Sequence, residues 1–142
     1  PCPASAASAD SGGAEPSAAD DILLGDTMGE LLLLLGTATV AVVGGSLVAH
    51  GGHNVLEAAA WGVPVISGPH MENFGDICEQ LCAAGGMRQL QDPAELAPCL
   101  LALLRDPELC RRMGAAGREV VDRNRGASAR LLGLVARQLA GA

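Results

Sequence analysis

The sequence predicts an α/β fold in which a parallel sheet carries helices on both faces. The main observation is a unit that occurs three times: a short apolar run, a turn, a polar residue with an acid three positions later, and a helix. A second observation is the Asp-Pro pair ahead of Glu95 and again ahead of Glu108, which predicts helix starts in the C-terminal part. Alternating strands and helices imply right-handed crossovers, so the strands run parallel and both faces of the sheet are covered.

The first two units have clear boundaries. A strand is predicted at 22–24, and the capping-box pattern Thr27-x-x-Glu30 opens a leucine-rich helix that ends at Gly36. The largely β-branched run at 39–43 predicts the second strand. A loop rich in glycine and histidine then leads to a helix over 54–61.

The remaining elements continue this alternation. A third strand is predicted at 64–67, and Asn73 with Asp76 caps a helix over 73–84. A further strand is predicted within 85–90. The C-terminal helices are predicted at 93–104, 107–123 and 127–139. Their arginines are assigned to solvated faces without a ligand role, at positions 111, 112, 118, 123, 130 and 137.

The composition excludes several classes of function. The chain has 142 residues, a net charge of −7 and no lysine, which argues against a surface for nucleic acid or for anionic membranes. Trp61 and Phe74 are the only aromatic residues, so a base-stacking platform is absent. The five cysteines show no C-x-x-C spacing and are predicted to be reduced thiols. The three histidines lack a neighbouring acidic cluster, so no metal site is expected.

The N-terminal part divides into a linker and the start of the domain. Residues 1–20 are mainly Ala, Ser, Pro and Gly and are predicted to be a disordered low-complexity linker, with the domain at 21–142. Residues 31–49 carry no charge and reach the length of a transmembrane helix. Internal glycines and the change from leucines to β-branched residues indicate two short buried elements instead, so no transmembrane segment is predicted.

The stretch 39–57 predicts a strand, a glycine loop and a helix N-terminus in that order. A helix N-terminus attracts phosphate or carboxylate, and the glycines at 44, 45, 51 and 52 allow a ligand to approach the backbone. Glu57 would there accept hydrogen bonds from a sugar diol. The same Asn54-x-x-Glu57 spacing also fits a capping box that only satisfies the helix end, so two interpretations stay open. Parallel topology places 26–30, 44–57 and 68–73 at one edge of the sheet.

Two motifs narrow this reading. The stretches LLGDTMGELLLL (23–34) and VVGGSLVAHGGHNVLEAAAWGVPVISGPHMENF (42–74) resemble the C-terminal part of 3-deoxy-D-manno-octulosonic acid (Kdo) transferases, which are glycosyltransferases of the GT-B architecture. The resemblance covers about residues 21 to 140. It implies a Rossmann-like parallel sheet that forms an incomplete GT-B C-terminal domain. The chain departs from the family pattern at Leu35, where an aromatic residue is usual, and at three positions where proline is common, namely 49, 55 and 58.

The resemblance implies transfer of Kdo from CMP-Kdo to a lipid A precursor at the cytoplasmic face of the bacterial inner membrane, or in an organelle if the source is eukaryotic. In such enzymes the C-terminal domain holds the nucleotide sugar, whereas the N-terminal domain holds the acceptor and the catalytic base. The N-terminal domain and the first strands of the donor domain are therefore expected to be missing from this chain, and no catalytic residue is expected in it. No cofactor is implied, because GT-B enzymes do not normally need a metal.

The resemblance also implies a set of donor-binding residues. The backbone of Thr27, Met28 and Gly29 would line the cytosine. The helix start at Asn54, Val55 and Leu56 would face the phosphate, and Glu57 would hold the ribose hydroxyls. Ser46 and His53 are secondary candidates, and His70 and Asn73 rank below them.

Two alternatives remain at this stage. One is a non-catalytic module that binds a nucleotide sugar or a protein partner, which the expected absence of a base favours. The other is a GT-B transferase with a different donor, such as a UDP-sugar, although the GGHN and GPH pieces count against it. A small sheet with one truncated edge would also leave apolar surface exposed, so the chain is expected to be marginally stable alone or to dock on a partner.

Overall fold

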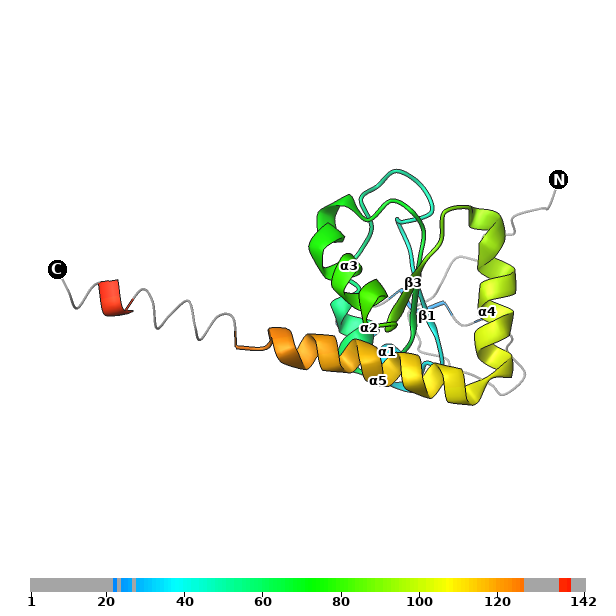
Figure 1. The fold of residues 1–142 in the computed structure, drawn as a ribbon. Helices are drawn as coiled ribbons and strands as arrows, with labels where there is room; N and C mark the ends of the chain where they lie inside the picture. Colours follow the sequence, from blue (N-terminus) through cyan, green and yellow to red (C-terminus); the bar gives the residue numbers. More distant parts are fainter. Residues whose placement is uncertain (1–21, 23, 27, 127–135, 139–142) are drawn as a thin grey trace.

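The computed structural model describes residues 22, 24–26, 28–126 and 136–138 (Figure 1). The predicted linker and most of the predicted helix 127–139 lie outside these residues. A three-stranded parallel sheet in the order β1-β2-β3 forms the centre of the fold. Its strands are β1 (Ala41–Val43), β2 (Val65–Ser67) and β3 (Met87–Gln89). The predicted strand within 85–90 is therefore confirmed as β3.

Helices cover both faces of this sheet, as predicted. The helices are α1 (Leu31–Thr37), α2 (Leu56–Ala60), α3 (Gly75–Ala83), α4 (Leu96–Arg105) and α5 (Pro107–Asn124), with single 3-10 turns at Glu72–Phe74 and Pro93–Glu95. Figure 1 shows α3 and α4 on opposite sides of the strands. The α/β prediction is thus confirmed.

The buried residues form two clusters, one on each face. On one face, Val65 packs with residues of α2, α3 and the second half of α5. On the other face, Ile66 packs with Leu103 of α4 and Met113 of α5. Because successive residues of a strand point to opposite faces, the all-apolar start of β2 supplies both clusters.

Helix α5 approaches the sheet closely because glycines face glycines. A Cβ on Gly114 would overlap the carbonyl oxygen of Gly62, and a Cβ on Gly86 would lie 2.5 Å from the backbone nitrogen of Gly117. The start of α5 is fixed as predicted, since the side chain of Asp106 accepts a hydrogen bond of 2.9 Å from the Leu109 amide. The position of α5 against α2 therefore depends on residues without side chains.

The predicted strand at 22–24 is wrong for the residues that the structure describes there. Ile22 and Leu24 are 88% and 83% exposed and belong to no strand. Strand β1 pairs with β2 on one side only, and a strand needs such a partner to satisfy its backbone groups. The apolar run alone therefore does not make a strand.

The helix after this segment starts later and ends later than predicted. Helix α1 begins at Leu31, its N-cap is Glu30, and the proposed cap Thr27 lies outside the described residues. The helix also continues through Gly36 instead of ending there. A Cβ on Gly36 would lie 3.4 Å from the ring of Trp61, so this glycine makes room for an aromatic ring.

The cap predicted for α3 is also wrong. Asn73 lies in the 3-10 turn, and α3 begins at Gly75 with Phe74 as its N-cap and without a side-chain cap. The backbone N–H of Asn73 instead donates a hydrogen bond of 3.3 Å to the carbonyl oxygen of Gly51. This long-range contact holds Asn73 outside the helix that its sequence pattern suggests.

Within the part of the chain that the structure describes, no helix is long and apolar enough to cross a membrane. The four cysteines of that part, Cys78, Cys82, Cys99 and Cys110, are free thiols, as predicted. Burial raises the pKa of the Cys78 thiol to about 11, with a contribution from Cys82.

We expect the free energy of unfolding to fall as the pH rises from about 9 to 11, because the folded state keeps Cys78 protonated while the unfolded state releases its proton. The chain has no lysine and no tyrosine, so the other side chains that titrate in this window are cysteines, of which Cys82 and Cys110 also have a pKa raised by burial and add to the slope. Urea unfolding at each pH measures the slope, and Cys78→Ala should reduce it. An equal slope in that variant would contradict the assignment to Cys78.

Candidate functional site

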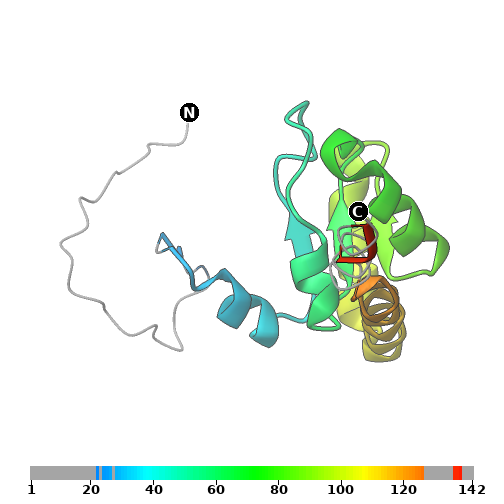
Figure 2. The ribbon, with the colours of Figure 1, turned by 90° about the vertical axis from the view of Figure 1, so that its left-hand side faces the viewer.

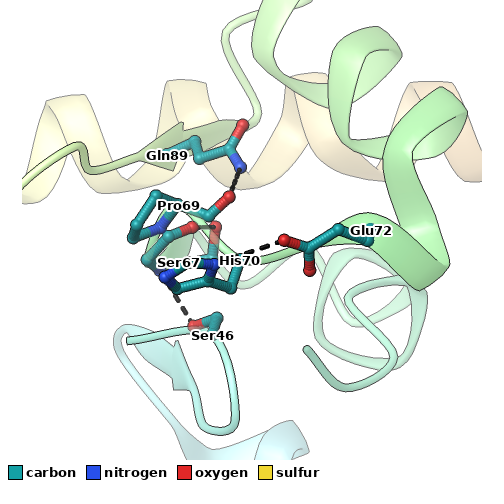
Figure 3. Close-up of polar contacts among 7 residues, drawn as sticks. Ser46, Ser67, Pro69, His70, Glu72 and Gln89 are labelled. Carbon is teal, nitrogen blue, oxygen red and sulfur yellow. Dashed lines mark hydrogen bonds and ion pairs between the residues drawn. The ribbon is translucent and has the colours of Figure 1, made fainter. Parts of the chain in front are cut away.

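The loops that follow β1 and β2 are joined through a buried serine. The Ser46 hydroxyl donates a hydrogen bond of 2.5 Å to the carbonyl oxygen of Val43 and accepts one of 2.9 Å from the Gly68 amide. Figure 3 shows Ser46 facing the turn between Ser67 and His70. The carboxyl ends of two neighbouring strands are thereby fixed to each other.

Backbone contacts extend this connection along both loops. The His70 amide donates to the Ser46 carbonyl oxygen at 3.0 Å, and within the first loop the Gly52 amide donates to the Gly45 carbonyl oxygen at the same distance. Gly51 and Gly52 have φ values of +81° and +73°, which side chains with a Cβ rarely adopt. The prediction that 44–57 and 68–73 share one edge of the sheet is confirmed.

The end of β3 joins the same edge. The Gln89 side-chain amide donates a hydrogen bond of 3.1 Å to the carbonyl oxygen of Pro69 (Figure 3). On the other side of Pro69, His70 Nδ1 lies 3.2 Å from Glu72 Oε1. Hydrogen bonds from the backbone and from His70 lower the pKa of the Glu72 carboxyl. His70 is therefore engaged with a carboxylate of its own loop.

The start of α2 is ordered by the side chain of Asn54, which also contacts Glu57. Asn54 Oδ1 accepts a hydrogen bond of 3.0 Å from the Leu56 amide, which is an Asx turn. The Asn54 side-chain nitrogen donates to Glu57 Oε1 at 3.1 Å. In a capping box the glutamate would reach a backbone amide instead. Asn54 therefore orders the helix start and also orients the Glu57 carboxylate.

The other candidates of this loop differ in accessibility. Val55 and Ser46 are buried, so Val55 presents backbone only and Ser46 acts as a clamp between the loops. His53 is exposed, and its ring lies over Gly45, where a Cβ would be 3.3 Å from Nε2. Asn54 is exposed as well and Glu57 is partly exposed, so a ligand can reach the side chains of His53, Asn54 and Glu57.

The segment 26–30 does not share this edge, contrary to the sequence-based expectation. Figure 2 shows it beyond α1, away from the loops after β1 and β2. Met28 is 98% exposed, and Gly29 has a φ of +93°. Thr27 lies outside the described residues. Without a strand at 22–24 beside β1, nothing brings this segment to the carboxyl ends of the strands.

A surface cavity of about 500 Å³ lies between α1, α2 and α5 beside Glu57. Arg118 of α5 and Arg125, the residue directly after α5, line it, and both are paired with Asp122, at 3.9 Å and 3.4 Å respectively. The sequence predicts a solvated face for Arg118 and does not single out Arg125. Their spacing of seven positions, about two helical turns, was the available signal that they could lie on one side of the C-terminal helix.

Among residues 22, 24–26, 28–126 and 136–138, no three His, Cys, Asp or Glu side chains are grouped so that they could hold a metal ion. The sequence does not reveal the roles of Gly68 and Gln89, which connect the three strand ends. Their partners lie about twenty positions away in the chain, so no local pattern reveals them.

We expect Ser46→Ala to lower the free energy of unfolding by about 1–3 kcal/mol, because the buried Gly68 amide loses its acceptor. Ser67→Ala is the matched control: Ser67 is equally buried, but its hydroxyl donates only to the adjacent Gly68 carbonyl oxygen, at 3.2 Å. Urea unfolding of both variants measures the difference. Equal losses would show that the Ser46 clamp adds nothing specific.

Comparison with known families identifies a match over most of the described part. Residues 18–120 match the model of the glycosyl transferases group 1. The chain is 46% identical over 121 residues to a 3-deoxy-D-manno-octulosonic acid transferase of Haemophilus influenzae, covering 84% of this chain and 28% of that protein. The corresponding values for the transferase of Bordetella pertussis are 40% identity, 85% and 28%. The chain thus spans about 28% of the length of these relatives.

Two further comparisons concern the fold and the kinds of organism in which similar proteins occur. The crystal structure of the C-terminal CMP-Kdo binding domain of WaaA from Acinetobacter baumannii matches with a TM-score of 0.64 and 35% sequence identity, covering 68% of this chain and 51% of that one. An Arabidopsis thaliana protein, a probable mitochondrial 3-deoxy-D-manno-octulosonic acid transferase, is 34% identical over 105 residues, covering 72% of this chain and 24% of that protein.

Proposed function

Because this chain belongs to the group 1 glycosyl transferases, we propose that it is the donor-binding part of a Kdo transferase and that it binds CMP-Kdo. The observation that carries this proposal is the structural match to a CMP-Kdo binding domain at 35% identity. The joined loops after β1 and β2 support it, since sheets of this kind bind their ligands outside the carboxyl ends of the strands.

The donor would lie above these loops. The glycine-rich backbone of 44–52 lets a phosphate approach, and the amides at the start of α2 would stabilise the charge of CMP as it leaves. Glu57, oriented by Asn54, would accept hydrogen bonds from the ribose hydroxyls. Met28 and Gly29 would reach the cytosine only if the segment 26–30 moved to this edge of the sheet.

The chemistry would be attack by an acceptor hydroxyl on the anomeric carbon of Kdo with departure of CMP. A general base must take the proton of that hydroxyl, and we propose that the base and the acceptor site lie on polypeptide outside this chain. We further propose that the step needs no metal, that the acceptor is a lipid A precursor, and that the complete enzyme works at the cytoplasmic face of a bacterial inner membrane, or in an organelle if the source is eukaryotic. A chain that binds CMP but supports no transfer with any partner would fit the alternative of a non-catalytic binding module.

Calorimetric titration with CMP, and with UMP as a control, tests the donor site. We expect CMP to bind more tightly than UMP and the binding to be unchanged by EDTA. Glu57→Ala should weaken CMP binding by about tenfold or more, because a hydrogen bond to a charged group contributes about 1.5–3 kcal/mol. Glu119→Ala is the matched control, since Glu119 is an exposed glutamate of α5 away from the loops.

Two results of this titration would contradict the proposed donor site. Equal affinity for CMP in the wild type and in Glu57→Ala would show that the nucleotide does not bind at the start of α2. No binding of CMP by a chain that circular dichroism shows to be folded would overturn the donor-domain proposal.

A further inference from the structure

Histidines are the only residues on the joined loops 44–57 and 68–74 whose side chains could carry a positive charge, because these loops contain no arginine or lysine. Of the three, His70 is engaged with Glu72 at 3.2 Å. Within the described part of the chain, the rings of His50 and His53 take part in no hydrogen bond or ion pair, and both residues are exposed. An imidazole ring always carries at least one N–H donor. Two side-chain donors on these loops are therefore available to a ligand.

The position of its ring distinguishes His53 from His50. The His53 ring lies over the two glycines that follow β1, since a Cβ on Gly45 would be 3.3 Å from Nε2 and a Cβ on Gly44 would be 4.0 Å from Nδ1. The hydrogen bond from the Gly52 amide to the Gly45 carbonyl oxygen closes the loop. His50 lies inside this closed loop, whereas His53 directly follows it. His53 is thus the free histidine at the carboxyl end of β1, where parallel sheets bind their ligands.

The proposed donor carries two acidic groups close together. In an ulosonic acid joined to CMP, the anomeric carbon is bonded both to the carboxylate and to the bridging oxygen of the phosphate. A neutral hexose of a UDP-sugar has a hydrogen atom in place of that carboxylate. With the phosphate at the glycine-rich backbone of 44–52, the carboxylate lies beside the same loop. A side chain that binds this carboxylate would therefore separate an acidic donor from a neutral one.

We propose that His53 binds the carboxylate of the donor sugar and thereby selects a donor whose anomeric carbon carries an acid. This inference rests on the proposed function, since it takes CMP-Kdo as the donor. A ring N–H of His53 donates to the carboxylate, and a hydrogen bond to an ionised acceptor is stronger than a neutral one. The glutamates of the two loops cannot take this role, because an ionised carboxylate only accepts hydrogen bonds and repels a second anion. Gly44 and Gly45 position the ring by leaving room for it.

Calorimetric titration of the full chain with CMP-Kdo and, separately, with CMP tests the proposal. We expect the wild type to bind both ligands. His53→Ala should weaken the binding of CMP-Kdo by about tenfold and change the binding of CMP by less than about twofold, because CMP has no carboxylate. His53→Gln keeps an N–H donor at this position, so its loss of affinity for CMP-Kdo should be smaller, about threefold.

His50→Ala is the matched control, because His50 is an exposed histidine of the same loop. It should keep both affinities, and circular dichroism should show all three variants folded. Equal weakening of CMP and CMP-Kdo binding by His53→Ala would show that the ring only supports the loop. Unchanged binding of CMP-Kdo would assign the carboxylate to another group. Either result, or a wild type that binds CMP but not CMP-Kdo, would overturn this inference and leave the CMP site in place. A folded wild type that binds neither ligand would overturn the donor-domain proposal as well.

Discussion

Gly114→Ala should lower the free energy of unfolding by about 3 kcal/mol, one of the largest losses that a single methyl group can cause in this chain. The added Cβ would overlap the carbonyl oxygen of Gly62, which is backbone at the end of α2 and cannot rotate away. Overpacking of this kind typically costs about 1–3 kcal/mol and sometimes more. Helix α5 would have to shift away from α2, which also moves Arg118 and Arg125 relative to Glu57.

Gly75→Ala is the matched control for this substitution. Gly75 is the first residue of α3, its φ is −49°, and no atom lies within 4 Å of the position of a Cβ. Replacing a glycine in a compatible conformation stabilises by about 0.4–1 kcal/mol, because the unfolded chain loses freedom. Urea unfolding of the two variants should therefore give changes of opposite sign. A neutral Gly114→Ala would show that α5 does not need this close approach.

The parts of the fold that were predicted correctly depend on local patterns. β2 follows from a short apolar run between helices, β3 from its place in the alternation of strands and helices, and the start of α5 from Asp106 and the proline after it. Each of these signals acts within a few residues of the chain. Such local signals predict the structure correctly where no long-range contact competes with them.

The incorrect predictions are the places where a long-range contact decides. Asn73 has the spacing of a helix cap, but its amide bonds to Gly51, 22 positions earlier in the chain. Gly36 is predicted to end the helix, but α1 continues through it, and the missing side chain makes room for the ring of Trp61. The segment at 22–24 is apolar like a strand, yet it lacks a partner beside β1. In each case the local pattern was real and the tertiary environment overruled it.

The candidate site was likewise predictable where it depends on topology or local spacing, and not where it depends on long-range contacts. Parallel topology alone placed the loops after β1 and β2 at one edge, and the spacing of Asn54 and Glu57 marked the helix start, although their side chains bond to each other and do not form the capping box that the spacing also allowed. The clamp between Ser46 and Gly68 was not predictable, because these residues are brought together by strand pairing. The arginines beside Glu57 depend on the crossing of α2 and α5, which glycine contacts set.

Gly68→Ala should cost both stability and donor binding, because Gly68 lies at the junction of the two loops. A Cβ there would lie 2.6 Å from the carbonyl carbon of Ser46 and 2.8 Å from the Cα of Leu47, so the backbone itself must move. We expect a loss of about 2–3 kcal/mol in the free energy of unfolding. The clamp through the Ser46 hydroxyl should open as the loops separate.

The same substitution should weaken CMP binding by at least tenfold at a temperature where the variant stays folded, since the loop 44–52 would no longer hold the position that the proposed phosphate site requires. Gly85→Ala serves as its control: Gly85 has a φ of +76°, so the strain of a positive φ is present, but no atom lies within 4 Å of the Cβ position. This control should lose stability and keep its CMP affinity. If Gly68→Ala bound CMP as tightly as the control does, the donor would not depend on the joined loops, and the proposed site would have to be sought beside α2 and α5 instead.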